Sequence, residues 1–135
     1  TVNLVEKYLK NDNVISLEYI GVYPTKQNEI DDVYKTIKKL KDQYQCKRFI
    51  ISWLKATYYF SSTNIYALPD RLKKSYIDDI DVGFVFDLKS ETFKNVKLAL
   101  AELNTQVFFG NNQIRANTYS DFESALNAFR NIKNP

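Results

Sequence analysis

Carboxylates, lysines, tyrosines and asparagines are the side chains available for chemistry in this chain, which contains no histidine and a single cysteine. The absence of histidine excludes the Ser-His-Asp and Cys-His nucleophile systems and the common histidine-ligated zinc sites. The lone thiol, Cys46, excludes thiolate clusters and an intrachain disulfide, which weakly indicates a reducing compartment. With only Gly21, Gly83 and Gly110, the chain cannot build a glycine-rich phosphate loop.

One pattern of carboxylates and lysine would suit phosphodiester hydrolysis. Pro69-Asp70 followed by Asp87-Leu88-Lys89 has the spelling of a PD-(D/E)xK nuclease core. In such a core both carboxylates hold a divalent metal ion, and the lysine polarises the attacked phosphate or its water. Asp87 and Lys89 on one strand would point to the same face. The pattern is short and arises easily by chance in a chain with 26% charged residues, so a metal-dependent nuclease is the third of our functional hypotheses.

A second acidic group, Asp78, Asp79 and Asp81, offers the oxygen ligands that Mg²⁺ and Ca²⁺ prefer. The alternative, which we favour, is a solvated turn that precedes a strand. We therefore predict no metal, no cofactor and no catalytic residue, and we expect that the chain is not an enzyme.

Hydrophobic periodicity predicts four helices and four strands. Two of the helices have a capping pattern at their start, Asn3 with Glu6 and Ser120 with Glu123, and Ser90 caps a third. The predicted helices cover residues 3–10, 29–44, 90–104 and 120–133. The predicted strands cover residues 14–23, 47–54, 80–88 and about 114–118.

The order of these elements is helix, β-α-β-β-α-β, helix. The central six elements match the split-βαβ, ferredoxin-like arrangement, which is an α+β fold with a four-stranded antiparallel sheet backed by two helices. The length of 135 residues fits one domain. We expect a core of about residues 14–119, with extra N- and C-terminal helices at about 3–10 and 120–133.

Within that order, the local sequence resembles an RNA-recognition-motif (RRM) domain over roughly residues 14–119. Gly83-Phe84-Val85-Phe86 resembles the Gly-aromatic-small-aromatic core of the RNP1 segment of this family. Tyr19-Ile20-Gly21-Val22-Tyr23-Pro24 is similar to the RNP2 strand and its exit. The stretch from Ala99 to Gly110, followed by Ile114-Arg115-Ala116-Asn117, resembles the second helix and the last strand.

Several positions depart from the family pattern. Val82 stands where RNP1 normally begins with Lys or Arg, and Asp87 and Lys89 occupy an apolar and an aromatic position. In the RNP2 register, Glu18 occupies a core position. The resemblance therefore implies a divergent member of the family.

The predicted strand 80–88 has two interpretations, because strand alternation places its apolar residues on one face and its acids on the other. In the first, Phe84 and Phe86 pack in the core, and the other face of the sheet carries Asp81 and Asp87, which repel phosphate. In the second, Tyr19, Phe84 and Phe86 point outward and stack bases, as the RRM resemblance implies. The amphipathic helix 120–133 needs an apolar surface to cover, and the uncovered face of the predicted four-stranded sheet is available for it.

The leading hypothesis is a non-catalytic RNA-binding module that acts in RNA processing or translation. Lys47, Arg48 and Arg115 would contact phosphates beside the three stacking rings. The alternative is a degenerate RRM-like protein-interaction or assembly domain, with the sheet face or helix 29–44 as its docking surface. The net charge of +3 is compatible with RNA but does not require it. No apolar run approaches the roughly 18–20 residues of a membrane span, and we expect an intracellular protein.

Overall fold

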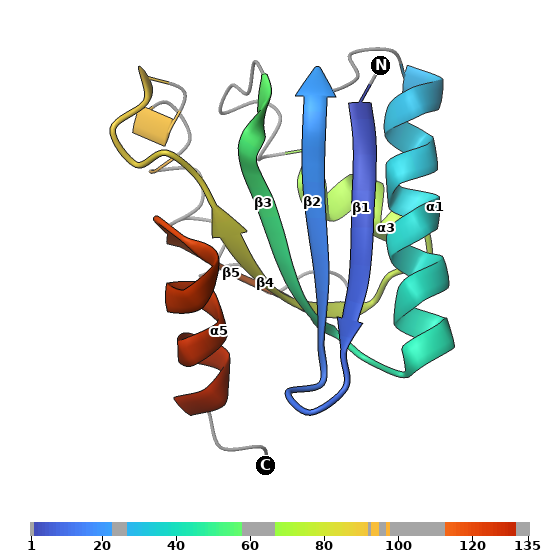
Figure 1. Cartoon of the computed structure of the whole chain (residues 1–135). Helices are drawn as coiled ribbons and strands as arrows, with labels where there is room; N and C mark the ends of the chain where they lie inside the picture. Colours follow the sequence, from blue (N-terminus) through green and yellow to red (C-terminus); the bar gives the residue numbers. More distant parts are fainter. Residues whose placement is uncertain are drawn as a thin grey trace.

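The computed structural model describes residues 2–22, 27–57, 67–91, 93–94, 97 and 113–131. These residues form an α+β fold in which helices lie on both faces of a central sheet (Figure 1). In chain order the elements are β1 (Val2–Leu9), β2 (Val14–Val22), α1 (Gln27–Tyr44), β3 (Arg48–Thr57), α3 (Leu68–Lys74), β4 (Asp79–Val85), β5 (Gln113–Tyr119) and α5 (Phe122–Asn131).

The sheet has five strands in the order β1-β2-β3-β4-β5. Strands β1 and β2 pair antiparallel, whereas the pairs β2–β3, β3–β4 and β4–β5 are parallel. The predicted ferredoxin-like sheet of four antiparallel strands is therefore wrong. The physical reason is α3, which has Pro69 in its first turn and carries the chain back between β3 and β4. A helical crossover makes two neighbouring strands parallel, whereas a hairpin connection would make them antiparallel.

The predicted N-terminal helix 3–10 is also wrong, because this segment is β1. It pairs with β2 along its whole length, from Val2 opposite Gly21 to Leu9 opposite Val14. The turn between the two strands is closed by the amide of Asp12, which donates to the Leu9 carbonyl at 3.2 Å. In so short a segment, tertiary pairing outweighs a weak helical pattern.

Helix α1 confirms the predicted helix 29–44 and shows why that helix ends where it does. Gln45 adopts a left-handed φ of 49° directly after the helix. The amide of Cys46 then donates to the carbonyl of Lys41 at 3.1 Å. These two features form a Schellman motif, which satisfies carbonyls that the last helical turn leaves without partners.

The larger hydrophobic core lies between the sheet and the helices α1 and α3. Leu40 of α1 and Leu72 of α3 pack there against the buried strand residues. The rings of Tyr19 and Trp53 stack with their centroids 4.2 Å apart. The buried strand residues of this core are Ile15, Leu17, Tyr19, Phe49, Ile51, Trp53, Ile80, Val82, Phe84 and Ala116.

A smaller core lies on the opposite face of the sheet, beneath α5 (Figure 1). Ala125, Leu126 and Phe129 of α5 are buried there against Val14, Ile50 and Val85. A Cβ atom at Gly83 would lie 3.3 Å from the Tyr119 ring and 3.4 Å from the Cβ of Ala125. Gly83 therefore allows α5 and Tyr119 to approach the sheet closely.

Helix α5 confirms the prediction of a C-terminal amphipathic helix, but its cap is a different residue. Asp121 accepts a hydrogen bond from the amide of Ser124 at 2.7 Å, and this bond is the largest cause of the lowered pKa of Asp121. At the other end, Arg130 donates to both carboxylate oxygens of Asp12 at 2.8 and 3.2 Å. This contact ties α5 to the β1–β2 turn.

The other predicted elements agree with the structure in part. Strands 14–23 and 47–54 correspond to β2 and β3, whereas β4 ends at Val85, before the predicted end at Leu88. Ser90 caps a helical segment as predicted, since the amide of Phe93 donates to its hydroxyl at 3.1 Å. The predicted corner within residues 99–110 lies outside the described residues. Among the described helices, none has the length and apolar character that crossing a bilayer requires.

Candidate interaction surface

The three rings predicted to stack on RNA bases lie in the larger core. Tyr19 and Phe86 are 1% exposed and Phe84 is 7% exposed. Phe86 also packs between Trp53 and Phe93, with centroid separations of 6.3 and 6.2 Å. The structure therefore favours the packing interpretation of Phe84 and Phe86, and these rings offer no stacking surface to solvent.

The three cations predicted to contact phosphates make contacts within the fold. Lys47 pairs with Asp79 at 3.0 Å, and Arg115 pairs with Asp79 at 2.8 Å and with Asp81. Arg48 donates to the Phe129 carbonyl, and its guanidinium lies over the Phe129 ring at 4.9 Å from the centroid. The structure brings Lys47 and Arg115 together around the Asp79 carboxylate, whereas Arg48 contacts Phe129 of α5.

The acidic group at the start of β4 is neutralised by these cations. Burial alone would raise the pKa of Asp79, but hydrogen bonds from Lys47 and Arg115 outweigh it, and the pKa is lowered. The neighbouring Asp78 pairs with Lys41 at 3.3 Å. Across the described part of the chain, no group of three or more Asp, Glu, Cys or His side chains is placed to hold a metal ion.

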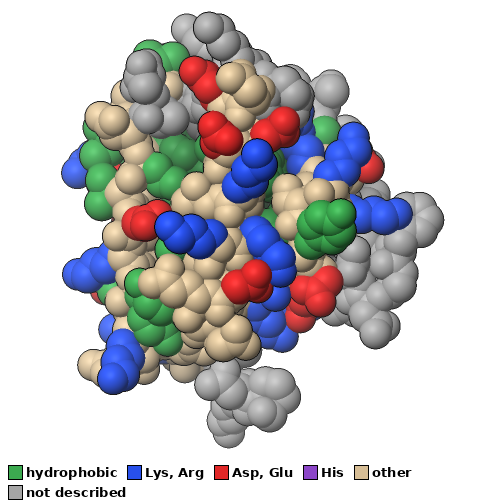
Figure 2. Space-filling model, turned by 90° about the vertical axis from the view of Figure 1, so that its right-hand side faces the viewer, with side chains coloured by type: hydrophobic (Ala, Val, Ile, Leu, Met, Phe, Trp, Pro, Cys, Tyr) green, Lys and Arg blue, Asp and Glu red, His purple; other side chains and the backbone are tan. Residues whose placement is uncertain are grey.

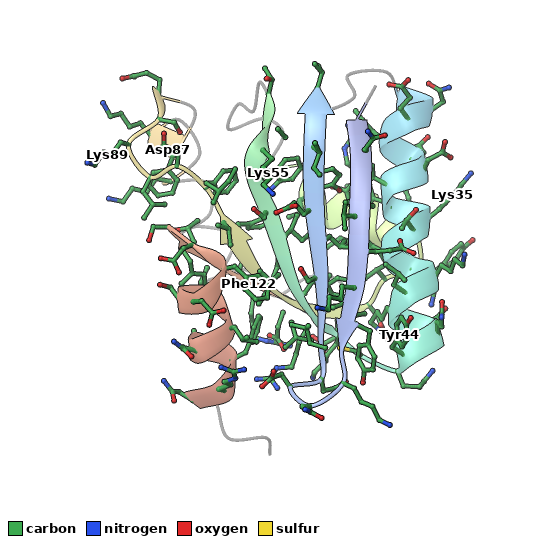
Figure 3. All side chains as sticks on the ribbon, viewed as in Figure 1. Lys35, Tyr44, Lys55, Asp87, Lys89 and Phe122 are labelled. Atoms are coloured by element: carbon green, nitrogen blue, oxygen red, sulfur yellow. The ribbon has the colours of Figure 1, made fainter. Side chains whose placement is uncertain are left out.

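The residues of the nuclease pattern lie on a short helix and in a turn. Asp70 pairs with Lys74 on α3 at 3.2 Å. Asp87 and Lys89 follow the end of β4, where the Lys89 amide donates to the Asp87 carboxylate at 3.0 Å (Figure 3). The expectation that Asp87 and Lys89 share one face of a strand is therefore wrong.

The second face of the sheet is covered by α5 only in part. This helix contacts β3, β4 and β5, and its core also includes Leu9 of β1 and Val14 of β2. It leaves the rest of β1 and β2 exposed on that face (Figure 1). Val14 lies under α5, so strand alternation places the other even-numbered residues of β2 on the same side. We call this exposed region the open face, and its residues are Asn3, Val5, Lys7, Glu18, Ile20, Val22 and Lys55.

Apolar side chains are unusually accessible on the open face. Val5 is 50% exposed and Val22 is 53% exposed, and Ile20 lies partly exposed between Asn3 and Lys55 on the neighbouring strands. Together with the aliphatic stem of Lys55, these residues form an apolar strip that crosses three strands. Such a strip with a polar rim is typical of a surface that another molecule covers.

One of the two lysines on the open face has no carboxylate partner among the described residues. Lys55 lies over the sheet beside β2 and pairs with Glu18 at 3.6 Å (Figure 3). Lys7 is exposed and has no ion-pair partner within the described ranges. A molecule that covers this face would therefore meet one uncompensated positive charge.

Strand β1 is also an edge of the sheet. The backbone groups of its alternate residues point away from β2, on a side where the described residues place no further strand. Its eight residues are long enough to pair with such a segment. The charged side chains of Glu6 and Lys7 interrupt the edge, as natural edge strands do to limit aggregation.

The other docking surface predicted from the sequence, the outer side of α1, has a different character. Each fully exposed residue of this helix that the structure describes is polar or charged. Both signs of charge are mixed over the surface (Figure 2). Lys38 pairs with Asp42 at 3.0 Å. This surface is therefore solvated and carries neither a basic patch nor an apolar strip.

The open face is not evident from the sequence, because Val5 fits a helical pattern and Val22 lies at the end of an RNP2-like strand. The available signal was the alternation of Ile20 and Val22 on the side of β2 opposite Leu17 and Tyr19.

No protein-family model matches the chain, and no curated protein shows significant sequence similarity to it.

Proposed function

We propose that the chain is a non-catalytic recognition module that binds an extended segment of a protein partner along β1 and over the open face. The observation that carries this proposal is the pair of half-exposed valines, Val5 and Val22, on a sheet face that α5 leaves bare beside a free edge. A segment that pairs with an edge strand gains affinity from main-chain hydrogen bonds and specificity from alternate side chains.

The charges of the open face define the chemistry of this partner. A strand added beside β1 places every second side chain next to Val5 and Lys7. Apolar residues at those positions would cover Val5, and a carboxylate would neutralise Lys7. The expected ligand is therefore an extended segment with alternate apolar residues and at least one acidic residue.

Two observations support a protein ligand over RNA. The rings expected to stack bases are buried, and Lys47 and Arg115 are already paired with carboxylates. RNA binding, the leading hypothesis from the sequence, makes a distinct prediction, because affinity for a polyanion falls steeply with salt. It therefore serves as the competing outcome of the experiment.

The experiment begins with selection of binders from a displayed random-peptide library on the whole chain. The dissociation constant of one selected synthetic peptide is then measured by calorimetry. We expect selected peptides to alternate apolar and acidic residues. The double variant Val5→Ser, Val22→Ser should weaken peptide binding at least about tenfold, because it removes the apolar contact that the two valines make with the bound peptide.

The matched control is Tyr76→Asn, which removes an apolar side chain that is 83% exposed and lies outside the open face. Asn tolerates the left-handed φ of 60° at this position. The control should leave the affinity for the peptide unchanged. Equal binding by the double valine variant would overturn the proposal, and so would salt-sensitive binding of a random-sequence RNA that is lost when Lys47, Arg48 and Arg115 are replaced.

A further inference from the structure

Helix α1 borders the edge of the sheet at which β1 lies. Figure 1 shows α1 alongside β1, on the side away from β2. The rings of Tyr8 and Tyr44 stack with their centroids 4.2 Å apart, so the last turn of α1 contacts the end of β1. Because α1 packs on the face opposite the open face, a strand added beside β1 would present alternate side chains to the open face and to α1.

The contacts of α1 within the fold show which of its flanks lies toward this edge. Tyr34 lines a hollow together with residues of α3, and Lys41 pairs with Asp78, next to β4, at 3.3 Å. This flank therefore faces α3 and β4, away from β1. Helical periodicity places a different set of residues on the opposite flank, which we call the edge flank. These residues are Glu29, Asp32, Thr36 and Gln43.

Two exposed carboxylates give the edge flank a negative charge at its start. Glu29 and Asp32 belong to the first turns of α1, and neither forms an ion pair with any residue that the structure describes. Carboxylates at the start of a helix interact favourably with its dipole, which is a structural role. Because the same two groups lie toward the edge of the sheet, they would also attract a cation on a strand bound there.

The charges beside the two ends of β1 have opposite signs. Strand β1 and helix α1 run side by side in the same direction (Figure 1), and Tyr44 marks the level of Tyr8 on the strand. Asp32 precedes Tyr44 by about 18 Å of helix, which corresponds to about five residues of a strand. The carboxylates therefore lie beside the start of β1 on the α1 side, whereas Lys7 lies near its end on the open face.

We infer that the segment bound along β1 carries one acidic and one basic residue about five positions apart. The acidic residue lies beside Lys7 on the open face, and the basic residue reaches Glu29 and Asp32 on the edge flank. The spacing is odd because successive residues of a strand point to opposite faces. This inference rests on the proposed function and adds a basic residue, with its position, to the ligand.

The peptides selected on the whole chain test the spacing. They should carry Lys or Arg about five positions from the acidic residue. Replacement of this basic residue by Gln in the synthetic peptide should weaken binding about threefold or more, because its exposed ion pairs are lost. Exchange of the basic residue with its neighbour, which turns it toward the open face, should weaken binding as much. Selected peptides without a basic residue at an odd spacing would overturn the inference.

A double variant of the chain tests the two carboxylates. Glu29→Gln, Asp32→Asn should weaken the original peptide about threefold or more. It should leave the affinity for the Gln-substituted peptide unchanged, because that peptide has already lost the interaction. The matched control Asp31→Asn removes a carboxylate from the same part of α1 on the flank that faces α3, and it should leave the affinity unchanged. Changes in unfolding temperature without any change in affinity would reduce the carboxylates to a structural role and overturn the inference.

The same measurements separate this inference from the proposed function. Weak binding by Val5→Ser, Val22→Ser together with normal binding by Glu29→Gln, Asp32→Asn would overturn the inference and leave the proposed function standing. A chain that selects no peptide would overturn both.

Discussion

The two faces of the sheet differ in how completely helices cover them. On the face of α1 and α3, the strands contribute a continuous set of buried apolar residues, including Tyr19, Trp53 and Phe84. On the other face, α5 covers β3, β4, β5 and the start of β2 at Val14, whereas Val5 and Val22 stay half exposed on β1 and β2. The same five strands thus build a closed core on one side and an accessible apolar strip on the other.

Regular apolar patterning and accessible apolar side chains therefore lie on opposite faces of the sheet. The most regular apolar stripe in the sequence, on β4, is the centre of the closed core. The accessible strip comes from short apolar stretches that alternate with Asn3, Lys7 and Glu18. Predictions that separate stability from binding therefore test the difference between the two faces.

The largest expected effect is on the closed face. Phe84→Ala should lower the free energy of unfolding by about 3–5 kcal/mol, because it removes a buried ring from a packed core. Urea unfolding followed by circular dichroism measures this loss. Val5→Ala on the open face should stay within about 0.5 kcal/mol of the parent. An exposed stacking role for Phe84 would instead give a folded, equally stable Phe84→Ala variant.

The next effect concerns the junction between the sheet and α5. Gly83→Val should lower the free energy of unfolding by about 1–3 kcal/mol, because the new side chain would overlap Tyr119 and Ala125. Hydrogen exchange should also speed up in α5 more than in α1. Unchanged stability together with unchanged exchange in α5 would contradict the close packing at Gly83.

A smaller effect is expected at the ionic end of the same face. Arg115→Ala should lower the free energy of unfolding by on the order of 1 kcal/mol, because Asp79 and Asp81 then repel each other. The effect is small because solvent screens groups this exposed. The side chain of Arg115 is 41% exposed, and those of its two partners are 31% and 23% exposed. Lys38→Ala, which breaks an exposed pair on α1, is the control and should cost less. Equal losses from both variants would argue against a special role for this network.

The smallest effect is the pH dependence of the contact between α5 and the β1–β2 turn. The hydrogen bond from Arg130 lowers the pKa of Asp12 below its ordinary value. A carboxyl group with a lowered pKa stabilises the fold above its unfolded pKa of about 3.9, and this contribution is lost as pH falls through the folded pKa. Unfolding midpoints of the parent and of Asp12→Asn should therefore converge in acid. A constant difference down to about pH 2.5 would contradict the contact.

Hydrophobic alternation was enough to predict the individual strands of the closed face. Ile15 and Leu17 of β2 and the apolar run of β3 were correctly assigned, and so was the packing role of Phe84 in one of the two interpretations. The pairing of the strands was not predictable in the same way. It depends on α3, which has only seven residues and follows a stretch without clear periodicity.

The first strand shows a second limit of sequence patterns. Leu4, Val5, Tyr8 and Leu9 satisfy a helical stripe, but they equally satisfy an edge strand with apolar residues on both faces. Only pairing with β2 decides between these patterns. The open face could not be predicted, because its exposure depends on where α5 stops covering the sheet. The hollow between α1 and α3, which Asp31 and Arg71 line, could not be predicted either, since it brings together distant parts of the chain.

Hydrogen exchange of the β1 amides with and without the selected peptide tests the central claim most directly. We predict that alternate amides of β1, on the side away from β2, exchange more slowly in the complex while the amides of α1 stay unchanged. This pattern follows from a strand added at the free edge. Protection confined to α1, with no change in β1, would contradict the proposed recognition surface.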